Sequence, residues 1–165
     1  MKFNEAGVDK MRRKDREVTD QKEIKQIIDQ CKVCRIAMYD KAGLYIVPMN
    51  FGYTYEDSQL VLFFHSAKEG RKISALKENS NVCFEMDCEH QLITADVACG
   101  YGYFFKSIIG NGKVVFLDAI EEKKTALSLL MKHQTGQEFS FEDHMVTSVF
   151  VFKIIVNSYS GKDYH

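Results

Sequence analysis

One short segment of the chain combines the residue types that bind anions. It covers residues 65–72, with the sequence HSAKEGRK. Ser66 stands where a strand should end and a helix begin, and Glu69 follows at capping-box spacing, which predicts that Ser66 is the helix N-cap. A helix N-terminus offers free backbone N–H groups and the positive end of the helix dipole. Arg71 and Lys72 add two cations, so the segment predicts an anion site; a plain capped surface helix is the alternative.

The chain has a single proline, Pro48, inside an otherwise good strand pattern. Proline cannot donate a hydrogen bond to a β-ladder, so this strand is expected at a sheet edge or at a bulge. Backbone groups beside Pro48 then become available to a ligand with alternating donors and acceptors along one edge. An edge strand that binds nothing is the alternative.

Other chemically capable residues are less specific. His65 could contact an anion or a substrate, or it could be structural. Cys31 and Cys34 have C-x-x-C spacing, but no second ligand pair is suitably spaced for zinc. A redox motif would have a strand before it and a helix after it, whereas the order here is reversed. We therefore interpret both cysteines as structural residues at a helix–strand junction. Tyr101 and Tyr103 could stack on a flat ligand, and no metal site or catalytic carboxylate pair is predicted.

Composition indicates one ordinary domain of 165 residues, with 45% hydrophobic residues and a net charge of −1. The charge balance argues against nucleic acid as the main partner. No apolar run approaches the ~20 residues needed to span a membrane. The five cysteines and the absence of an export signal predict a cytoplasmic protein with reduced thiols. Residues 1–18, with their basic run from Met11 to Arg16, are expected to form a solvated N-terminal arm.

The elements expected to position these residues come mostly as runs of strands. Asp20 and Glu23 predict the start of a first helix, and Ile24, Ile27 and Ile28 its buried face. Strands are expected over 33–39, 44–53 and 59–64 as a meander, then over 81–87, 104–117 and 149–159, the last one central. Helices are expected over 67–78 and 119–134, residues 90–103 as irregular, and 135–147 stay ambiguous.

Gly110 and Gly112 are expected to mark a bulge or bend in the long strand. Short turns between the early strands favour antiparallel pairing. The chain is therefore predicted to be mainly β, an antiparallel split β-barrel of six or so strands with three to four flanking helices. A doubly wound nucleotide-binding sheet is disfavoured, because no Gly-x-Gly-x-x-Gly or Walker loop is present.

At these residues the sequence resembles the pyridoxamine 5'-phosphate oxidase-like flavoproteins, which have an FMN-binding split barrel. It is most similar to the nitroimidazole-resistance (Nim) type branch. The resemblance extends from residue 11 to residue 162. Its strongest block is 63–73, followed by Leu76 and 79–85, and a later match covers Cys99 and 105–112.

The resemblance implies a homodimer with FMN bound between the subunits. Cofactor-binding positions carried over from the family, with Ser107 contributed by the second subunit on resemblance alone, are Ile46, Val47, Pro48, Met49, Asn50, His65, Ser66, Ala67, Arg71, Lys72 and Ser107. Tyr101 and Tyr103 would line the substrate pocket, with His65 also on the substrate side, and no catalytic residue is assigned.

The activity implied is that of an FMN-dependent oxidoreductase, with nitroimidazoles or other nitroaromatic compounds as acceptors and a small molecule as electron donor. True pyridoxamine 5'-phosphate oxidases carry a C-terminal extension with tryptophan and arginine, whereas this chain has no tryptophan. Oxidation of the vitamin is therefore not expected. The alternatives are a non-catalytic FMN- or haem-binding module of the same fold and a structural dimer without a cofactor.

Overall fold

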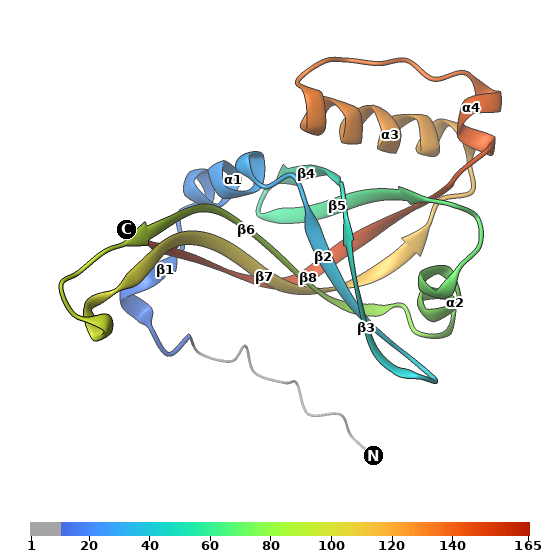
Figure 1. Ribbon diagram of the computed structural model, residues 1–165. Helices are drawn as coiled ribbons and strands as arrows, with labels where there is room; N and C mark the ends of the chain where they lie inside the picture. The colour runs from blue at the N-terminus through green and yellow to red at the C-terminus, as the bar shows by residue number, and fades with distance from the viewer. Residues whose placement is uncertain (1–10) are drawn as a thin grey trace.

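The computed structural model describes residues 11–165 and shows a mainly β protein (Figure 1). Every strand pairing is antiparallel, and the strand order is β3-β2-β6-β7-β8-β5-β4, with β1 added to β8. The strands are β1 (Glu17–Val18), β2 (Cys34–Asp40), β3 (Gly43–Met49), β4 (Gly52–Glu56), β5 (Gln59–Ser66), β6 (Asn81–Ile93), β7 (Gly102–Phe116) and β8 (Phe150–Tyr164). The helices are α1 (Gln21–Gln30), α2 (Arg71–Glu78), α3 (Ile120–Thr135) and α4 (Asp143–Thr147), with 3₁₀ turns η1 (Lys14–Arg16) and η2 (Ala98–Gly100). The predicted antiparallel split barrel is confirmed.

The two strands at the ends of this order, β3 and β4, are consecutive in the chain. Only Asn50 and Phe51 join them, and Phe51 is fully buried. The strand predicted over 44–53 is therefore two strands, and the predicted three-stranded meander is wrong. β3 pairs with β2, whereas β4 pairs with β5. The bend carries the chain from one end of the sheet to the other and closes the barrel around its core.

Helix α1 starts where its sequence predicts. The Asp20 carboxylate accepts hydrogen bonds from the backbone N–H groups of Lys22 at 2.8 Å and Glu23 at 3.1 Å. The helix buries its isoleucine face, Ile24, Ile27 and Ile28. Helix α3 also matches its expected span, and it packs across β4 and β5. None of the helices in residues 11–165 is long and apolar enough to cross a membrane.

Strands β6 and β7 form a long arm that projects from the barrel on the side opposite α2 (Figure 1). Residues 90–103, expected to be irregular, include the end of β6, the η2 turn and the start of β7. The β6–β7 register shifts between Cys88 and Gln91, and the β7–β8 register shifts between Asn111 and Gly112. The bend predicted at the glycines is thus confirmed, and β8 is central because it pairs with both β7 and β5.

The N-terminal segment contacts the sheet at the end of the part that the structure describes. Val18 is buried, and β1 pairs with Lys162 and Gly161 of β8. The Arg16 guanidinium carbon lies 3.4 Å from the centre of the Tyr164 ring. The basic run itself is mostly exposed, at Arg12, Arg13, Lys14 and Asp15, and β1 anchors its end to the sheet. Residues 1–10 lie outside the described residues.

Candidate functional site

The segment 65–72 lies at the junction of β5 and α2, but the helix begins later than predicted. Ser66 still belongs to β5, where it pairs with Phe150. Its side chain is only 7% exposed, and Oγ donates to the Ala67 carbonyl at 2.7 Å. The N-cap is Gly70, whose φ of 129° suits glycine. The capping role predicted for Ser66 is therefore wrong, because the strand extends to this residue and a short loop follows it.

The first turn of α2 is open to an anion. No side chain caps the helix, and the turn contains no acidic residue. The Gly70 carbonyl accepts from the N–H groups of Ile73 and Ser74. Within residues 11–165, the N–H groups of Arg71 and Lys72 have no acceptor. This helix start therefore presents two free donors together with the positive end of the dipole.

Three elements meet around the side chain of Arg71. Its Nε donates to Asp40 Oδ2 at 2.7 Å and its Nη2 to Asp40 Oδ1 at 3.1 Å. The guanidinium also lies over the Tyr45 ring, 4.3 Å from the ring centre. Hydrogen bonding in this pair raises the pKa of Arg71 and lowers the pKa of Asp40. Among the described residues, the Nη1 group of Arg71 has no acceptor and can meet a further anion.

Lys72 and His65 are two further residues of the same junction. Lys72 is half-buried and makes no ion pair with any residue of the described part of the chain. Desolvation, and then the charge of Lys72, lower the pKa of His65 below its ordinary value of 6.5. The imidazole is therefore neutral at neutral pH and can both donate and accept a hydrogen bond.

Strand β3 provides an unpaired backbone edge near these residues. Within the described residues it pairs only with β2, which confirms the edge position predicted from Pro48. Ile46 is 63% exposed on the outer face, whereas Met49 is buried in the core. The Asn50 amide is already used, because Nδ2 donates to Lys32 O at 3.1 Å and to Gln134 Oε1 at 3.2 Å. Among the predicted positions 46–50, a ligand can therefore contact the free backbone edge of β3 and outward side chains such as Ile46, but not the buried Met49.

Tyr101, Tyr103 and Ser107 lie far from the junction within one chain. His65 pairs with Val151, whose carbonyl accepts from the N–H of Leu117 just after β7. Tyr103 is 14 residues earlier in the chain, at the other end of β7, and the length along the strand is roughly 46 Å at ~3.3 Å per residue. Ser107 pairs with Asp87 and Lys162 in between. The structure thus gathers residues 65–72 and β3 but leaves the predicted substrate tyrosines at the other end of the molecule.

Asp40 is a site residue that the sequence analysis missed. It ends β2 and pairs with Gly43 across the turn, where it also accepts a hydrogen bond from the Ala42 N–H at 2.8 Å. An aspartate in a β-turn has a sufficient local explanation, so its sequence context pointed only to the turn. Its contact with Arg71 depends on α2 packing against β2, which local sequence does not reveal.

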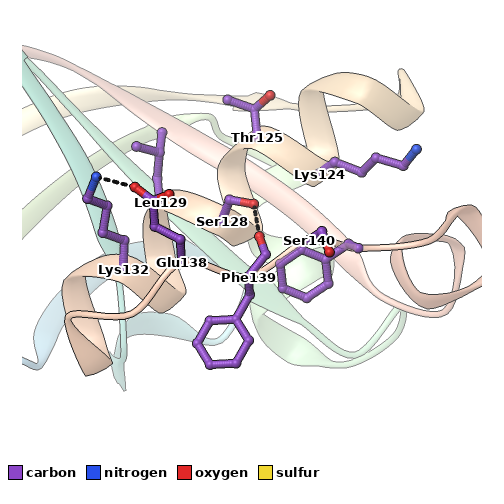
Figure 2. Close-up of a pocket in the computed structure, with 9 residues that line it drawn as sticks. Lys124, Thr125, Ser128, Leu129, Lys132, Glu138, Phe139 and Ser140 are labelled. Carbon is purple, nitrogen blue, oxygen red and sulfur yellow. Dashed lines mark hydrogen bonds and ion pairs between the residues drawn. The ribbon is translucent and has the colours of Figure 1, made fainter.

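Two cavities among the described residues lie away from this junction. One of about 500 Å³ lies between α3 and the segment that follows it, where Ser128 Oγ donates to Phe139 O and Lys132 pairs with Glu138 (Figure 2). Another of about 370 Å³ lies among α1, β4 and α3. Neither cavity includes residues 65–72. No group of three or more His, Cys, Asp or Glu residues within 11–165 could hold a metal ion.

Comparisons with known proteins agree with this architecture. The family model described as pyridoxamine 5'-phosphate oxidase matches residues 20–163. A proposed 5-nitroimidazole antibiotic resistance protein from Bacteroides thetaiotaomicron is 37% identical, with a TM-score of 0.76 over 88% of this chain and 85% of that one. An FAD- and haem-binding protein from Mycobacterium smegmatis shares the fold at 13% identity, with a TM-score of 0.77 over 91% and 74% of the two chains. A flavocytochrome from Azotobacter vinelandii does so at 16% identity, with a TM-score of 0.75 over 94% and 72%. No curated protein sequence matches the chain.

Proposed function

Because the chain belongs to the pyridoxamine 5'-phosphate oxidase family, we propose that it is an FMN-dependent oxidoreductase that holds the FMN phosphate at the start of α2. The observation that carries this proposal is the uncapped first turn of α2, with Arg71 and Lys72 beside two free backbone donors. Phosphate groups bind at such helix starts because N–H groups and the dipole both favour negative charge.

The residues present match the chemistry of FMN. Its phosphate requires several donors, which the N–H groups of α2, the Nη1 of Arg71 and the ammonium of Lys72 supply. Its ring has donors and acceptors along one edge, and the free edge of β3 offers backbone groups of both kinds. Asp40 holds the Arg71 guanidinium in a fixed orientation by two hydrogen bonds, and the Tyr45 ring packs against it.

When bound, FMN supplies the hydride and electron transfer, and the protein supplies binding, orientation and electrostatics. Arg71 and Lys72 neutralise the phosphate. The backbone of β3 would orient the ring. The neutral imidazole of His65 can donate a hydrogen bond to a substrate or accept one from it. No residue of the chain needs to act as a general base in this scheme.

We further propose that the working unit is a homodimer. Tyr101 and Tyr103 are half-exposed on an arm that cannot reach residues 65–72 of its own chain. A second subunit could place its arm, with Ser107, against the flavin. The outer sheet face carries exposed apolar side chains suited to such a contact, Tyr39, Leu44, Ile46 and Ile109.

For the electron acceptor we propose a flat nitroaromatic compound, such as a 5-nitroimidazole. This rests on the 37% identity with the proposed resistance protein from Bacteroides thetaiotaomicron. Tyrosine rings from the arm would stack on a ring of this kind.

The phosphate site is tested by titrating FMN into the purified protein and following the quenching of flavin fluorescence. The double variant R71A/K72A should bind FMN roughly 100-fold more weakly, because two charge-assisted contacts are lost. K77A removes a lysine from the last turn of the same helix and should bind as the wild type does. Wild-type protein that takes up no FMN, or a double variant that binds normally, would refute the site.

The activity is tested separately with the FMN-loaded protein, NADH or NADPH, and a 5-nitroimidazole, by following the loss of nitro absorbance. Turnover that depends on both the flavin and the reduced nicotinamide is expected. Tight FMN binding without turnover of any nitro compound would instead support the non-catalytic binding module.

A further inference from the structure

Cys31 and Cys88 lie side by side where the end of α1 meets the bulge of β6. Cys31 is the C-cap of α1, and its N–H donates to the Ile27 carbonyl at 3.1 Å. The sulfur of Cys88 lies 4.0 Å from the same carbonyl oxygen. Two cysteines that are 57 residues apart in sequence therefore meet at one backbone group.

The neighbouring residues show the same juxtaposition. Desolvation raises the pKa of Glu89, but hydrogen bonding from Lys106 and from the Gln30 side chain lowers it overall. Gln30 and Cys31 thus lie alongside Cys88 and Glu89. Interaction between the two thiols raises the pKa of Cys31 and lowers the pKa of Cys88.

Cys34, the other member of the C-x-x-C spacing, has a different environment. It is fully buried in β2, where it pairs with Met49. Burial is the main cause that raises the pKa of its thiol, and the neighbouring groups that also act on it are Glu85, Arg35 and Cys83. The cysteine that the packing of α1 on β6 brings to Cys31 is therefore Cys88, and not the Cys34 of the C-x-x-C spacing.

We propose that Cys31 and Cys88 form a reversible disulfide when the protein meets a small-molecule disulfide. Cys88 is half-buried and reachable, whereas Cys31 is buried, so Cys88 reacts first. The Cys88 thiolate attacks one sulfur of the reagent, the reagent's S–S bond breaks, and its first half leaves as a thiol that carries the proton from Cys88. Cys31 then displaces the second half, which leaves with the proton from Cys31. Two protein thiols are oxidised, and one reagent disulfide is reduced to two thiols.

This disulfide would tie the end of α1 to the base of the arm formed by β6 and β7. It requires no flavin, so its test does not depend on the proposed activity. The residues sensitive to oxidation would be Cys31 and Cys88, which lie away from the junction of β5 and α2.

The test uses the full-length variant C83S/C99S, which lacks the two exposed thiols and keeps three of the five cysteines (5 − 2 = 3). After incubation with oxidised glutathione, free thiols counted under denaturing conditions should fall from three to one. Trypsin digestion without reductant should then yield a linked pair of peptides, 26–32 and 78–106. These peptides contain Cys31 and Cys88 as their only remaining cysteines.

Three further variants in this background complete the experiment. Adding C34S should leave the linked peptides unchanged. Adding C88S should abolish them, and adding C31S should leave glutathione attached to Cys88. Far-UV circular dichroism shows whether each variant is folded. If one of the three further variants does not fold, the peptide masses of C83S/C99S still show whether Cys31 and Cys88 are linked. A link between peptides 26–32 and 33–35, or three free thiols in the treated protein, would overturn the proposal.

Discussion

Arg71 already has an anionic partner in the folded chain, the carboxylate of Asp40. The Arg71 side chain is 46% exposed, and solvent screening makes such ion pairs weak. A phosphate carries more negative charge than a carboxylate, and here it would also meet the free N–H groups of α2 and Lys72. Asp40 is therefore expected to orient Arg71 toward the phosphate, and its carboxylate should not prevent the phosphate from binding.

His133 is a second ionisable residue whose environment is defined by its contacts. Its Nε2 lies 2.8 Å from the Cys31 carbonyl oxygen, and its ring packs 4.6 Å from Phe51 and 5.2 Å from Tyr53, measured between ring centres. Burial lowers its pKa below 6.5, and this outweighs the hydrogen bond with Cys31, which raises it. The folded state thus favours the neutral ring.

A pH dependence of stability follows from this shift. Between the folded pKa of His133 and the unfolded value of about 6.5, the unfolded chain binds more protons, so the free energy of unfolding falls as the solution is acidified. This part of the stability is fully present above pH ~6.5 and is lost as the pH falls through the folded pKa. H133Q should flatten the dependence measured by urea unfolding between about pH 7.5 and pH 5.5. An NMR titration that placed the His133 midpoint at or above 6.5 would contradict it.

At the scale of elements, the contact between α3 and β4 depends on a glycine. A Cβ atom built on Gly52 would overlap the backbone of Leu129 and Leu130 in α3. Backbone cannot move aside as a flexible side chain can, so the helix sits directly on the strand only because residue 52 has no side chain. This contact lies immediately after the bend at Phe51 that closes the barrel.

G52A should therefore push α3 away from β4 and destabilise the protein by about 3 kcal/mol. For a chain of this size that corresponds to a decrease in Tm of roughly 6–12 °C. G102A is a matched control, because its Cβ would meet only the Ile93 side chain, at 3.1 Å, which can adjust. Thermal unfolding followed by circular dichroism compares the two variants. Equal melting temperatures for G52A and the wild type would refute this account of the contact.

Elements defined by local contacts are those that the sequence predicts well. The cap at Asp20 and the span of α3 depend on neighbours within one helical turn, and both are confirmed. The division of strand 44–53 depends on which distant strands its two halves pair with, and nothing local marks it. Ser66 has capping chemistry and so predicts too early a start for α2, because pairing with β8 keeps this residue in β5. Cys88 next to Cys31 likewise follows from packing of α1 on β6.

At the scale of the molecule, the residues of the proposed site lie at two opposite ends of the chain's fold. The junction proposed to bind the phosphate lies beside α2, at the opposite end from the arm of β6 and β7 (Figure 1). Tyr101 and Tyr103 lie at the start of β7, on this arm. Two chains that pack antiparallel along their outer sheet faces would bring the arm of each chain against the junction of β5 and α2 in its partner. Such a two-fold arrangement would form two equivalent sites.

The outer face offers a residue that tests this arrangement without touching the proposed phosphate site. Ile109 is 49% exposed on β7, in register with Glu85 of β6 and Ser160 of β8. A lysine at this position stays solvated in a single chain, so the fold of one chain should be unaffected. In an interface it would bury an unpaired charge, which is strongly unfavourable.

I109K should therefore convert a dimer of about 38 kDa (2 × 19.0 kDa) into a chain of 19.0 kDa, as measured by light scattering during size-exclusion chromatography. It should also weaken FMN binding, although Arg71, Lys72 and β3 are unchanged, because the partner's arm would be missing. M145K places the same charge on α4 at a methionine that is 46% exposed, and it should leave both mass and binding unchanged. Wild-type protein that elutes at 19.0 kDa and still binds FMN tightly would show that one chain suffices, and the proposed roles of Tyr101, Tyr103 and Ser107 would fall with the dimer.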